Sequence, residues 1–415
     1  MVQRAVLETR AAVRRALAAW STALATGATA RSERAAAGEG AGSAPLVLVA
    51  LSGGADSLAL AAATAYEAER AGLRAGAVVV DHALQQGSAL VAARAAEQAE
   101  RLGLAPVIVD RVRVGEGRGD GPEAAARAAR YAAFAQAAEC SGAAAILTAH
   151  TRDDQSEQVL LALARGSGLR SLAGIPPRRE LAFDGGPAAG GGAPGREARD
   201  GRSDGGGRPG EIDSSQDPGV AILRPFLTAP PEITRATTEA ACAETGLEPW
   251  RDPHNRDAAF SRVRVRERVL PVLVRELGPG VPAALARSAD LAREDADALD
   301  AIAEGIAAVA LAGISDEGEG AAGTPAVAGR ASPPRAGVAV EALAALPAAL
   351  LGRVIRVIAA RRFGAHLSRE HTSAIAALVT DWRGQGPVYV PGVRVSRAAG
   401  RLEFSHQTGS PRAPR

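Results

Sequence analysis

The chain has 415 residues, 47% of them hydrophobic, which is enough for two or three domains with sizeable cores. A net charge of +2 excludes a uniformly polycationic protein, so any nucleic-acid surface must be a local concentration of arginine, the residue that supplies all 48 basic side chains. The two distant cysteines, Cys140 and Cys242, belong to no CxxC pattern, which argues against a disulfide framework, a zinc site and an iron–sulfur cluster.

Residues 1–44 are predicted to form a helix and a linker. Residues 2–25 have an amphipathic pattern, with Val6, Ala12, Ala16 and Trp20 near one face and arginines on the other. The Gly/Ala/Ser-rich stretch 28–43 is typical of a linker. Docking of the helix on the core domain is favoured over RNA binding, and both are left open.

The next segment, 46–62, is predicted to be a buried strand, a Gly-rich loop and a helix. The loop comprises Ser52, Gly53, Gly54, Ala55, Asp56 and Ser57. A loop of this kind at a helix N-terminus binds anions, because backbone N–H groups point into it and the helix dipole adds positive potential. It is neither a Walker A motif, which needs a lysine, nor a GxGxxG fingerprint. An ordinary glycine turn is the alternative.

Strands and helices then alternate, which predicts an α/β fold with a doubly wound parallel sheet over residues 45–228. The expected strands are 76–81, 105–112, 143–148 and 220–226, and the expected helices are 88–102, 123–140 and one starting at Asp153. Ligands of such sheets collect at the carboxyl ends of the strands. Ser52, Asp81, His82 and His150 all fall at such ends.

The remaining segments are predicted from composition and periodicity. Residues 183–218 are rich in Gly, Pro, Asp, Ser and Arg, which indicates a disordered insertion. A helical region is expected over 229–312, with helices at 231–245, 260–276 and 280–312. A linker at 313–337 and a small domain at 338–406 follow, with helices at 338–363 and 367–381, a β-hairpin unit at 383–404 and a disordered tail at 407–415.

A second strong motif follows the fourth strand, His150-Thr-Arg-Asp153-Asp154-Gln155-Ser-Glu157-Gln158. A helix would bring Asp154 and Glu157 to one face, since they are three residues apart. Two carboxylates at a strand end, opposite a phosphate loop, can hold Mg²⁺ or an ammonium group. The alternative is a helix start at which aspartate only favours the helix dipole.

Three arginine-containing motifs complete the set. Arg127 and Arg130 precede Tyr131 on a predicted helix, where guanidinium groups could bind phosphates or simply face solvent. Arg165 and Gly166 begin a Gly-rich turn that is either a helix C-cap or a phosphate-contacting loop. After Asp252-Pro-His-Asn255, three arginines two residues apart suggest contact with RNA phosphates, or else a surface helix of an Arg-rich protein; these are Arg262, Arg264 and Arg266.

These segments together resemble the tRNA(Ile)-lysidine synthetase family of the ATP-pyrophosphatase (PP-loop) superfamily, from Leu46 to about Arg293 with the insertion excepted. SGGADS by itself indicates only the superfamily, and the HTRDDQSE block with RGSG and DPHNRD narrows it to the family. The resemblance implies that ATP adenylates the C2 carbonyl oxygen of the wobble cytidine in a CAU anticodon. The ε-amine of free L-lysine then displaces AMP, which makes lysidine in tRNA(Ile).

The resemblance also implies residue roles. The loop from Ser52 to Ser57 would bind ATP, with Asp81 and His82 near adenosine and Mg²⁺ neutralising the leaving pyrophosphate. Asp56, Arg130, Asp154 and Glu157 would be catalytic, with Asp56 as candidate metal ligand and Asp154 and Glu157 around the lysine. Substrate contacts would come from His150, Asp153, Gln155, Arg165, Gly166, Arg262, Arg264 and Arg266. Val263 and Gln158 stand where the family pattern has Asn and often Thr.

Rival functions and the location of the protein are addressed by the same sequence. A tRNA 2-thiolation enzyme would use cysteines or a cluster for sulfur transfer, and a non-catalytic RNA-binding protein would not need the intact carboxylates. No apolar run approaches the roughly 20 residues of a membrane span, and arginines interrupt the place of a signal-peptide core. We expect a cytoplasmic protein without a membrane segment, and a homodimer is left open.

Overall fold

The computed structural model describes residues 3–32, 44–81, 87–112, 121–166, 168–181, 220–228, 230–312 and 335–407. The chain divides into two compact units, Met1–Ala289 and Asp290–Arg415. The expected insertion at 183–218, most of the expected linker at 313–337, the tail beyond residue 407 and His82 lie outside the described residues.

The first unit is built on a six-stranded sheet with the order β3-β2-β1-β4-β6-β5. Five strands are parallel: β1 (Leu46–Ala50), β2 (Arg74–Asp81), β3 (Val107–Arg111), β4 (Ala143–Leu147) and β6 (Val220–Leu223). The doubly wound parallel sheet is therefore confirmed, with one addition. The edge strand β5 (Arg178–Leu181) runs antiparallel to β6, and it escaped prediction because three of its four residues are exposed.

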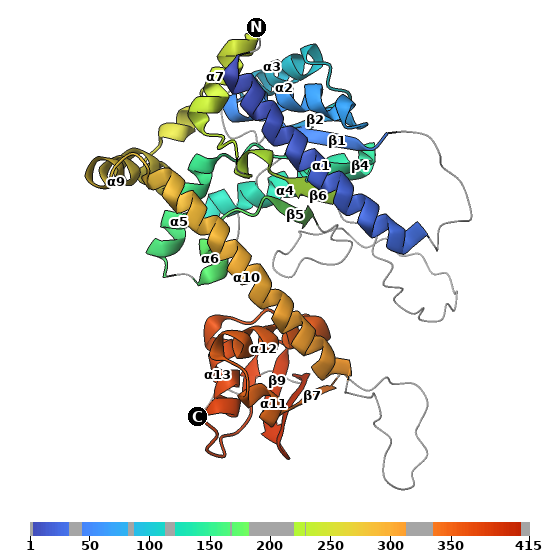
Figure 1. Ribbon diagram of the computed structural model, residues 1–415, viewed down its shortest axis with the longest axis vertical. Helices are drawn as coiled ribbons and strands as arrows, with labels where there is room; N and C mark the ends of the chain where they lie inside the picture. The colour runs from blue at the N-terminus through green and yellow to red at the C-terminus, as the bar shows by residue number, and fades with distance from the viewer. Residues whose placement is uncertain are drawn as a thin grey trace, which may run out of the picture. The chain divides into compact units, whose positions relative to one another are not determined.

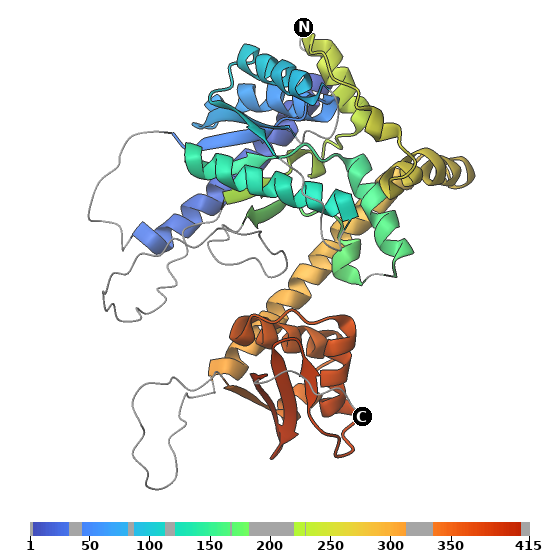
Figure 2. The same ribbon diagram turned by 180° about the vertical axis from the view of Figure 1, so that it is seen from behind.

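Helices cover both faces of this sheet, because successive side chains of each buried strand point to opposite sides. Val47 and Val49 of β1 pack on the face covered by α1 (Arg4–Ser32), α2 (Ala55–Arg70), α3 (Ser88–Arg101) and α7 (Arg235–Thr245). Leu46 and Leu48 pack on the other face against Phe134 of α4 (Gly121–Ser141). Figure 2 shows α4 in front of the sheet, and Figure 1 shows α1 and α2 there.

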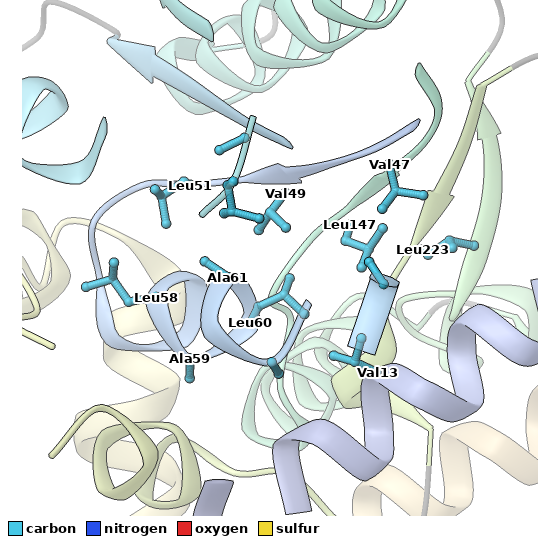
Figure 3. Close-up of a cluster of buried hydrophobic side chains, with 14 of the residues drawn as sticks. Val13, Val47, Val49, Leu51, Leu58, Ala59, Leu60, Ala61, Leu147 and Leu223 are labelled. Atoms are coloured by element: carbon cyan, nitrogen blue, oxygen red, sulfur yellow. The ribbon is translucent and has the colours of Figure 1, made fainter. Parts of the chain in front are cut away.

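The N-terminal helix α1 docks on the core, as favoured from the sequence. Ala12, Val13, Leu17 and Trp20 are buried against the first face of the unit. Figure 3 shows Val13 among the side chains of α2 and the sheet. The buried carboxylate of Glu67 on α2 accepts hydrogen bonds from Arg10 and Arg14 of α1. These polar contacts add to the apolar packing between the two helices. The helix is thus an integral layer of the first unit.

The order of the strands locates a switch point between β1 and β4, where the connections depart in opposite directions. In open α/β sheets this is the crevice in which ligands bind, outside the carboxyl ends of the strands. Ser52 follows β1 and His150 follows β4, so the two strongest sequence motifs flank the switch point.

Several short segments follow β4 in the first unit. They are α5 (Arg152–Ala164), α6 (Leu169–Leu172), η1 (Pro225–Leu227), η2 (Pro253–Arg256), α8 (Ser261–Arg264), the π-helical turn η3 (Val265–Val269) and α9 (Leu270–Leu277). The expected Arg-rich helix is therefore present but contains a π turn. Pro271 follows that turn and has no N–H to donate, which is consistent with the local change in hydrogen bonding.

The boundary between the two units falls within α10 (Val281–Ala312), a single long helix. The second unit contains α11 (Val340–Ala344), α12 (Ala348–Phe363), α13 (Arg369–Thr380), β7 (Arg335–Ala339), β8 (Val388–Val390), β9 (Val393–Ala398) and β10 (Arg401–His406). Its antiparallel sheet has the order β7-β10-β9-β8. The expected linker up to residue 337 and the helix starting at 338 were wrong here, because residues 335–339 pair with β10 as a strand.

Within the described ranges, no single helix combines the length and the apolarity that crossing a membrane requires. Two consecutive helical segments, Ser261–Leu277 and Val281–Ala312, are together long and apolar enough by length and composition alone, but they are bent by 101° relative to each other.

Candidate active site

The loop after β1 forms a tight cradle at the N-terminus of α2. Gly53 has φ of +81°, a conformation that favours glycine, and Gly54 is the N-cap. The Ser57 hydroxyl donates to the Gly54 carbonyl (2.9 Å) and accepts from the Ser52 backbone N–H (3.2 Å). The first N–H groups of a helix have no acceptor within it, so this end of α2 presents donors to an anion.

A loop from a distant part of the chain closes over this cradle. The Trp250 N–H donates to the Gly53 carbonyl (2.9 Å). The Gln98 side chain on α3 holds the same loop by accepting from the Glu248 N–H (3.0 Å). The segment that contains Trp250 and Asn255 therefore becomes a wall of the site.

Asp56 lies in the first turn of α2 and accepts a hydrogen bond from the Thr238 hydroxyl on α7. Burial raises the pKa of Asp56 from 3.8 to about 6. The Thr238 bond and Arg235 oppose this rise, and the nearby carboxylates Asp154 and Asp153 increase it. Asp56 is therefore a carboxylate for which a bound cation would be favourable.

One cavity of about 500 Å³ brings these groups together. Its walls come from the ends of β1, β2 and β4, from α4, and from the loop containing Trp250. The polar and aromatic residues that line it are Ser52, Asp56, Ser57, Asp81, Ser88, Arg127, Arg130, Tyr131, Phe134, Thr148, His150, Asp154, Trp250, Asp252 and Asn255.

The β2 side of the cavity is mostly apolar. Val78, Val79 and Val80 line it together with Val91 of α3. Asp81 ends this wall, and its buried carboxylate lies 3.5 Å from the Arg111 guanidinium. An apolar wall that ends in one fixed carboxylate can accommodate a heteroaromatic ring with a polar edge.

At the opposite side, the start of α5 holds Asp154. Its Oδ2 accepts from the Thr151 N–H (2.8 Å), which is one half of a capping box, and also from the Thr151 hydroxyl (3.0 Å). Its Oδ1 accepts from Arg235 (2.7 Å). Burial alone would raise the pKa of Asp154, but Arg235, His150 and the Thr151 bonds lower it below its ordinary value. Asp154 thus presents a stable negative charge to the cavity.

Glu157 lies behind Asp154 and is completely buried. Arg235 reaches its Oε1 (2.9 Å), and Arg266, on the π turn, contacts both of its oxygens (2.8 and 3.3 Å). Burial lowers the pKa of Arg235, but Asp154 and Glu157 raise it above its ordinary value. Glu157 does not line the cavity; it holds two arginines in position beside Asp154.

His150 is a neutral group at the end of β4. Its Nδ1 lies 3.1 Å from the Thr148 hydroxyl. Burial lowers the pKa of His150 to about 4, Asp154 opposes this fall, and Arg224, Arg262 and Arg127 reinforce it. The imidazole is therefore uncharged at neutral pH and can act as a hydrogen-bonding group in the cavity.

Arginines of α4 supply positive charge to the cavity. Arg127 and Arg130 both line the cavity and are exposed to solvent. Desolvation lowers the pKa of Arg130, as do Arg127 and Arg262, while Tyr131 raises it. Because guanidinium groups remain charged at neutral pH, the cavity combines positively charged groups with its carboxylates.

Other residues expected to contact substrate do not line the cavity. Gln155 is completely buried, and its side chain binds the backbone of Ala173 and Ile175. Asp153 accepts from the Arg235 N–H (2.8 Å). Arg262 donates to Gln158 (3.0 Å), so one of the two departures from the family pattern supplies that arginine with an acceptor.

The remaining expected substrate contacts lie on surface segments. Arg165 is the C-cap of α5 and donates to the Leu161 carbonyl (3.0 Å), and Gly166 follows it with φ of +61°. Arg264 is exposed and donates to the carbonyls of Ala258 and Ala259.

Sequence reasoning missed the two residues that support the carboxylates, Arg235 and Thr238. They are three positions apart on α7 and so share one face of the helix, where they contact Asp154 and Asp56 respectively. No local signal identifies them, since both contacts span more than 80 residues of sequence. Trp250 and Asn255 belong to a motif recognised in the sequence, but no role in the cavity was assigned to them.

Neither cysteine is suited to sulfur transfer in this site. Cys242 is buried, and burial together with Asp56 raises its pKa to about 12. Cys140 is exposed on α4 and does not line the cavity. In the part of the chain that the structure describes, no group of three or more His, Cys, Asp or Glu side chains could hold a metal ion.

Each of the two units contains a segment that matches the profile of a known protein family. The profile of a PP-loop domain matches residues 30–273, and that of the TilS substrate binding domain matches residues 339–403. A solved U34-tRNA thiolase, NcsA from Methanococcus maripaludis, aligns with a TM-score of 0.45 at 14% identity, covering 70% of this chain and 80% of its own, a likeness too distant to inform the site.

Curated relatives are much closer in sequence. The tRNA(Ile)-lysidine synthase of Leifsonia xyli subsp. xyli is 51% identical over 88% of this chain and 90% of its own length. The enzymes of the same name from Salinispora arenicola and Thermobifida fusca are 49% and 45% identical, over 86% and 85% of this chain and 89% of their own length in each case. The chain belongs to the tRNA(Ile)-lysidine synthase family.

Proposed function

We propose that this protein is a ligase that joins free L-lysine to C2 of the wobble cytidine in the CAU anticodon of tRNA(Ile), with consumption of ATP. The observation that carries the proposal is the single cavity in which the Ser52 loop, the apolar β2 wall, the α4 arginines and Asp154 converge. Such a cavity offers a phosphate-binding loop, an apolar wall for a base and a carboxylate for an amine.

In the first step, the cytidine O2 attacks the α-phosphorus of ATP, and the bond to pyrophosphate breaks. The loop from Ser52 to Ser57 binds the phosphates through its backbone donors and the α2 dipole. The adenine ring lies on the β2 wall beside Asp81. The uncharged imidazole of His150 and the guanidinium of Arg130 contact the base and the charge that develops on the phosphates.

In the second step, the neutral ε-amine of lysine attacks C2, the C2–O bond breaks, and AMP leaves. Asp154 faces the cavity with a stable negative charge and therefore contacts the amino group of the lysine. Glu157 acts through Arg235 and Arg266 and does not itself touch the lysine. The amine loses a proton after attack, and Asp56, with a pKa of about 6, can take it when it holds no cation.

Asp56 also suits Mg²⁺, since a hard cation needs oxygen ligands and is commonly held by one or two carboxylates together with substrate phosphates. Burial makes ionisation of Asp56 unfavourable, and a cation would reverse this effect. When bound, Mg²⁺ would neutralise charge on the leaving pyrophosphate. Because tRNA is made and used in the cytoplasm, we propose that the enzyme works there.

The test is transfer of radiolabelled lysine to a tRNA(Ile) transcript with a CAU anticodon, in the presence of ATP and Mg²⁺. A methionine tRNA with the same anticodon is the control substrate, and Asp154→Asn is the inactive control enzyme. Transfer to the first tRNA only, abolished in Asp154→Asn, supports the proposal. Pyrophosphate exchange that depends on another substrate, without lysine transfer, would refute it.

A further inference from the structure

A cluster of three arginines surrounds Tyr131 at the rim of the cavity, and we call it the Tyr131 cluster. Arg127, one helical turn earlier on α4, and Arg224, which follows β6, both donate to the Tyr131 hydroxyl (3.3 and 3.2 Å). The guanidinium groups of Arg127 and Arg179 lie 5.1 and 5.4 Å from the centre of the Tyr131 ring. The cluster thus unites α4, β5 and β6 around one aromatic side chain.

The charge of this cluster has no counter-charge in the described residues. None of the three arginines forms an ion pair with a carboxylate there. Arg224 is only 2% exposed, and its Nε is buried without a hydrogen-bond partner. Burial alone would raise the pKa of the Tyr131 phenol, but the surrounding arginines lower this pKa below its ordinary value. Three positive charges held together without an acidic partner indicate a site for an anion.

The neighbouring arginine on β5 provides a contrast. Successive residues of a strand point to opposite faces, so Arg178 and Arg179 lie on different sides of β5. Arg178 forms an ion pair with Glu180 (2.7 Å), whereas Arg179 lies over Tyr131. Both arginines are exposed. The absence of a carboxylate partner is therefore particular to the side that faces the cluster.

The position of the cluster separates it from the loop proposed to bind ATP. Arg224 follows β6, and Ser52 follows β1, with β4 between them. Two strand spacings amount to about 10 Å, too far for one phosphate group to contact both places. Arg127 and Tyr131 line the cavity, however, so an anion bound at the cluster lies beside whatever enters the cavity.

We propose that the Tyr131 cluster binds a backbone phosphodiester of the RNA substrate next to the nucleotide that enters the cavity. Guanidinium forks match phosphate oxygens, and Arg127 and Arg179 are exposed, so a polymer can reach them from outside. The phosphodiester would hold the RNA strand at the rim while the target base lies inside. This inference rests on the proposed function, because it takes tRNA as the substrate.

The test compares Arg179→Met with Arg178→Met, neighbouring exposed arginines on one strand. Binding of a fluorescent tRNA(Ile) transcript is measured over a series of salt concentrations. For Arg179→Met we expect weaker binding at low salt and a slope of log K against log salt that is shallower by about 0.7, the value for one lost contact to a single-stranded phosphate. Arg178→Met should keep the slope of the unaltered protein.

A double variant and the affinity for ATP sharpen the result. Arg127→Met with Arg179→Met should weaken binding further, but the slope should change by no more than about 0.7 in total, because both arginines contact the same phosphodiester. The KM for ATP should not change in Arg179→Met. Equal slopes for Arg178→Met and Arg179→Met, or a loss of ATP affinity without a loss of tRNA affinity, would overturn the inference.

Failure of the inference can be told apart from failure of the proposed function. If the unaltered protein transfers lysine to the transcript and Arg179→Met binds tRNA with an unchanged slope, only the phosphodiester site is refuted. If the unaltered protein binds tRNA but transfers no lysine, the proposed function fails, and the slope comparison still decides whether the cluster contacts RNA phosphate.

Discussion

The contact between Thr238 and Asp56 is predicted to set the pH dependence of the enzyme. Burial raises the pKa of Asp56 to about 6, and the Thr238 hydroxyl holds it down by donating to the ionised carboxylate. Thr238→Val keeps the shape of this completely buried side chain but removes the donor. The carboxylate then loses a stabilising partner, and its pKa must rise further.

The size of the effect follows from the energy of that bond. A hydrogen bond to a charged group contributes about 1.5–3 kcal/mol. One pKa unit corresponds to about 1.36 kcal/mol, so the variant's acid limb should move upward by about one to two pH units. In the unaltered protein, activity that needs ionised Asp56 should rise as the pH passes through about 6.

The assay is the pH dependence of kcat/KM for ATP, which reports the ionisations of the free enzyme. Thr245→Val is the matched control, because Thr245 lies on the same helix and donates to the Ala241 carbonyl rather than to Asp56. His150 cannot produce the limb, since its pKa is about 4. An acid limb that stays in place in a folded Thr238→Val variant would refute the reasoning.

Three further predictions concern the same site and its support. Arg235→Met should lower kcat/KM for lysine by about tenfold or more, with partial recovery in Arg235→Lys, because Asp154 loses its ion pair with a largely covered arginine. Arg10→Met removes one of two arginines from a buried carboxylate outside the cavity and should leave kcat/KM for lysine unchanged. Asp56→Asn should abolish activity but raise the melting temperature at neutral pH. The Asp56 carboxyl keeps its proton up to about pH 6 in the folded state, whereas the unfolded chain releases it near pH 3.8. The stability of the unaltered protein therefore falls as the pH rises from 3.8 to about 6, and the neutral Asn side chain avoids this loss. Gly174→Ala should cost about 1–3 kcal/mol of stability, because φ is +65° and the new Cβ would lie 2.7 Å from the Gln155 Oε1, while the KM for ATP stays the same.

Each of these three has a contrary result. A kcat/KM for lysine that falls equally in Arg235→Met and Arg10→Met would indicate a general loss of packing. An unchanged or lower melting temperature in Asp56→Asn at neutral pH would contradict the raised pKa of Asp56. A Gly174→Ala variant as stable as the unaltered protein would show that the loop next to α5 can rearrange without cost.

Local patterns were sufficient for the frame of the first unit. A run such as Leu46–Ala50 is apolar at every position because both faces of a parallel strand are covered, and the glycines of the following loop mark its end. The carboxyl ends of parallel strands meet at one edge of a sheet, so the motifs at Ser52 and His150 were predicted together without knowledge of any contact. The family itself was evident from the motifs and is confirmed by the relatives.

Weak local signals account for the errors of assignment. The edge strand β5 has a single buried residue, Leu181, so it shows neither an apolar run nor alternation. The segment 335–339 is short and rich in Ala and Gly, and it forms a strand only because it pairs with the edge of β10. In both places the neighbouring strand decides the structure, and a sequence pattern contains no information about that neighbour.

The chemistry of the carboxylates was decided by tertiary structure alone. The sequence identifies Asp56, Asp154 and Glu157 as acidic residues in motifs, but it cannot tell that Asp154 faces the cavity while Glu157 is completely buried. Thr238 and Arg235 reach these carboxylates from α7, 182 and 81 residues away in the chain. Charge, burial and hydrogen bonds set each pKa through groups that meet only when the chain is folded, and so the sequence specifies which residues are available while packing determines what each can do.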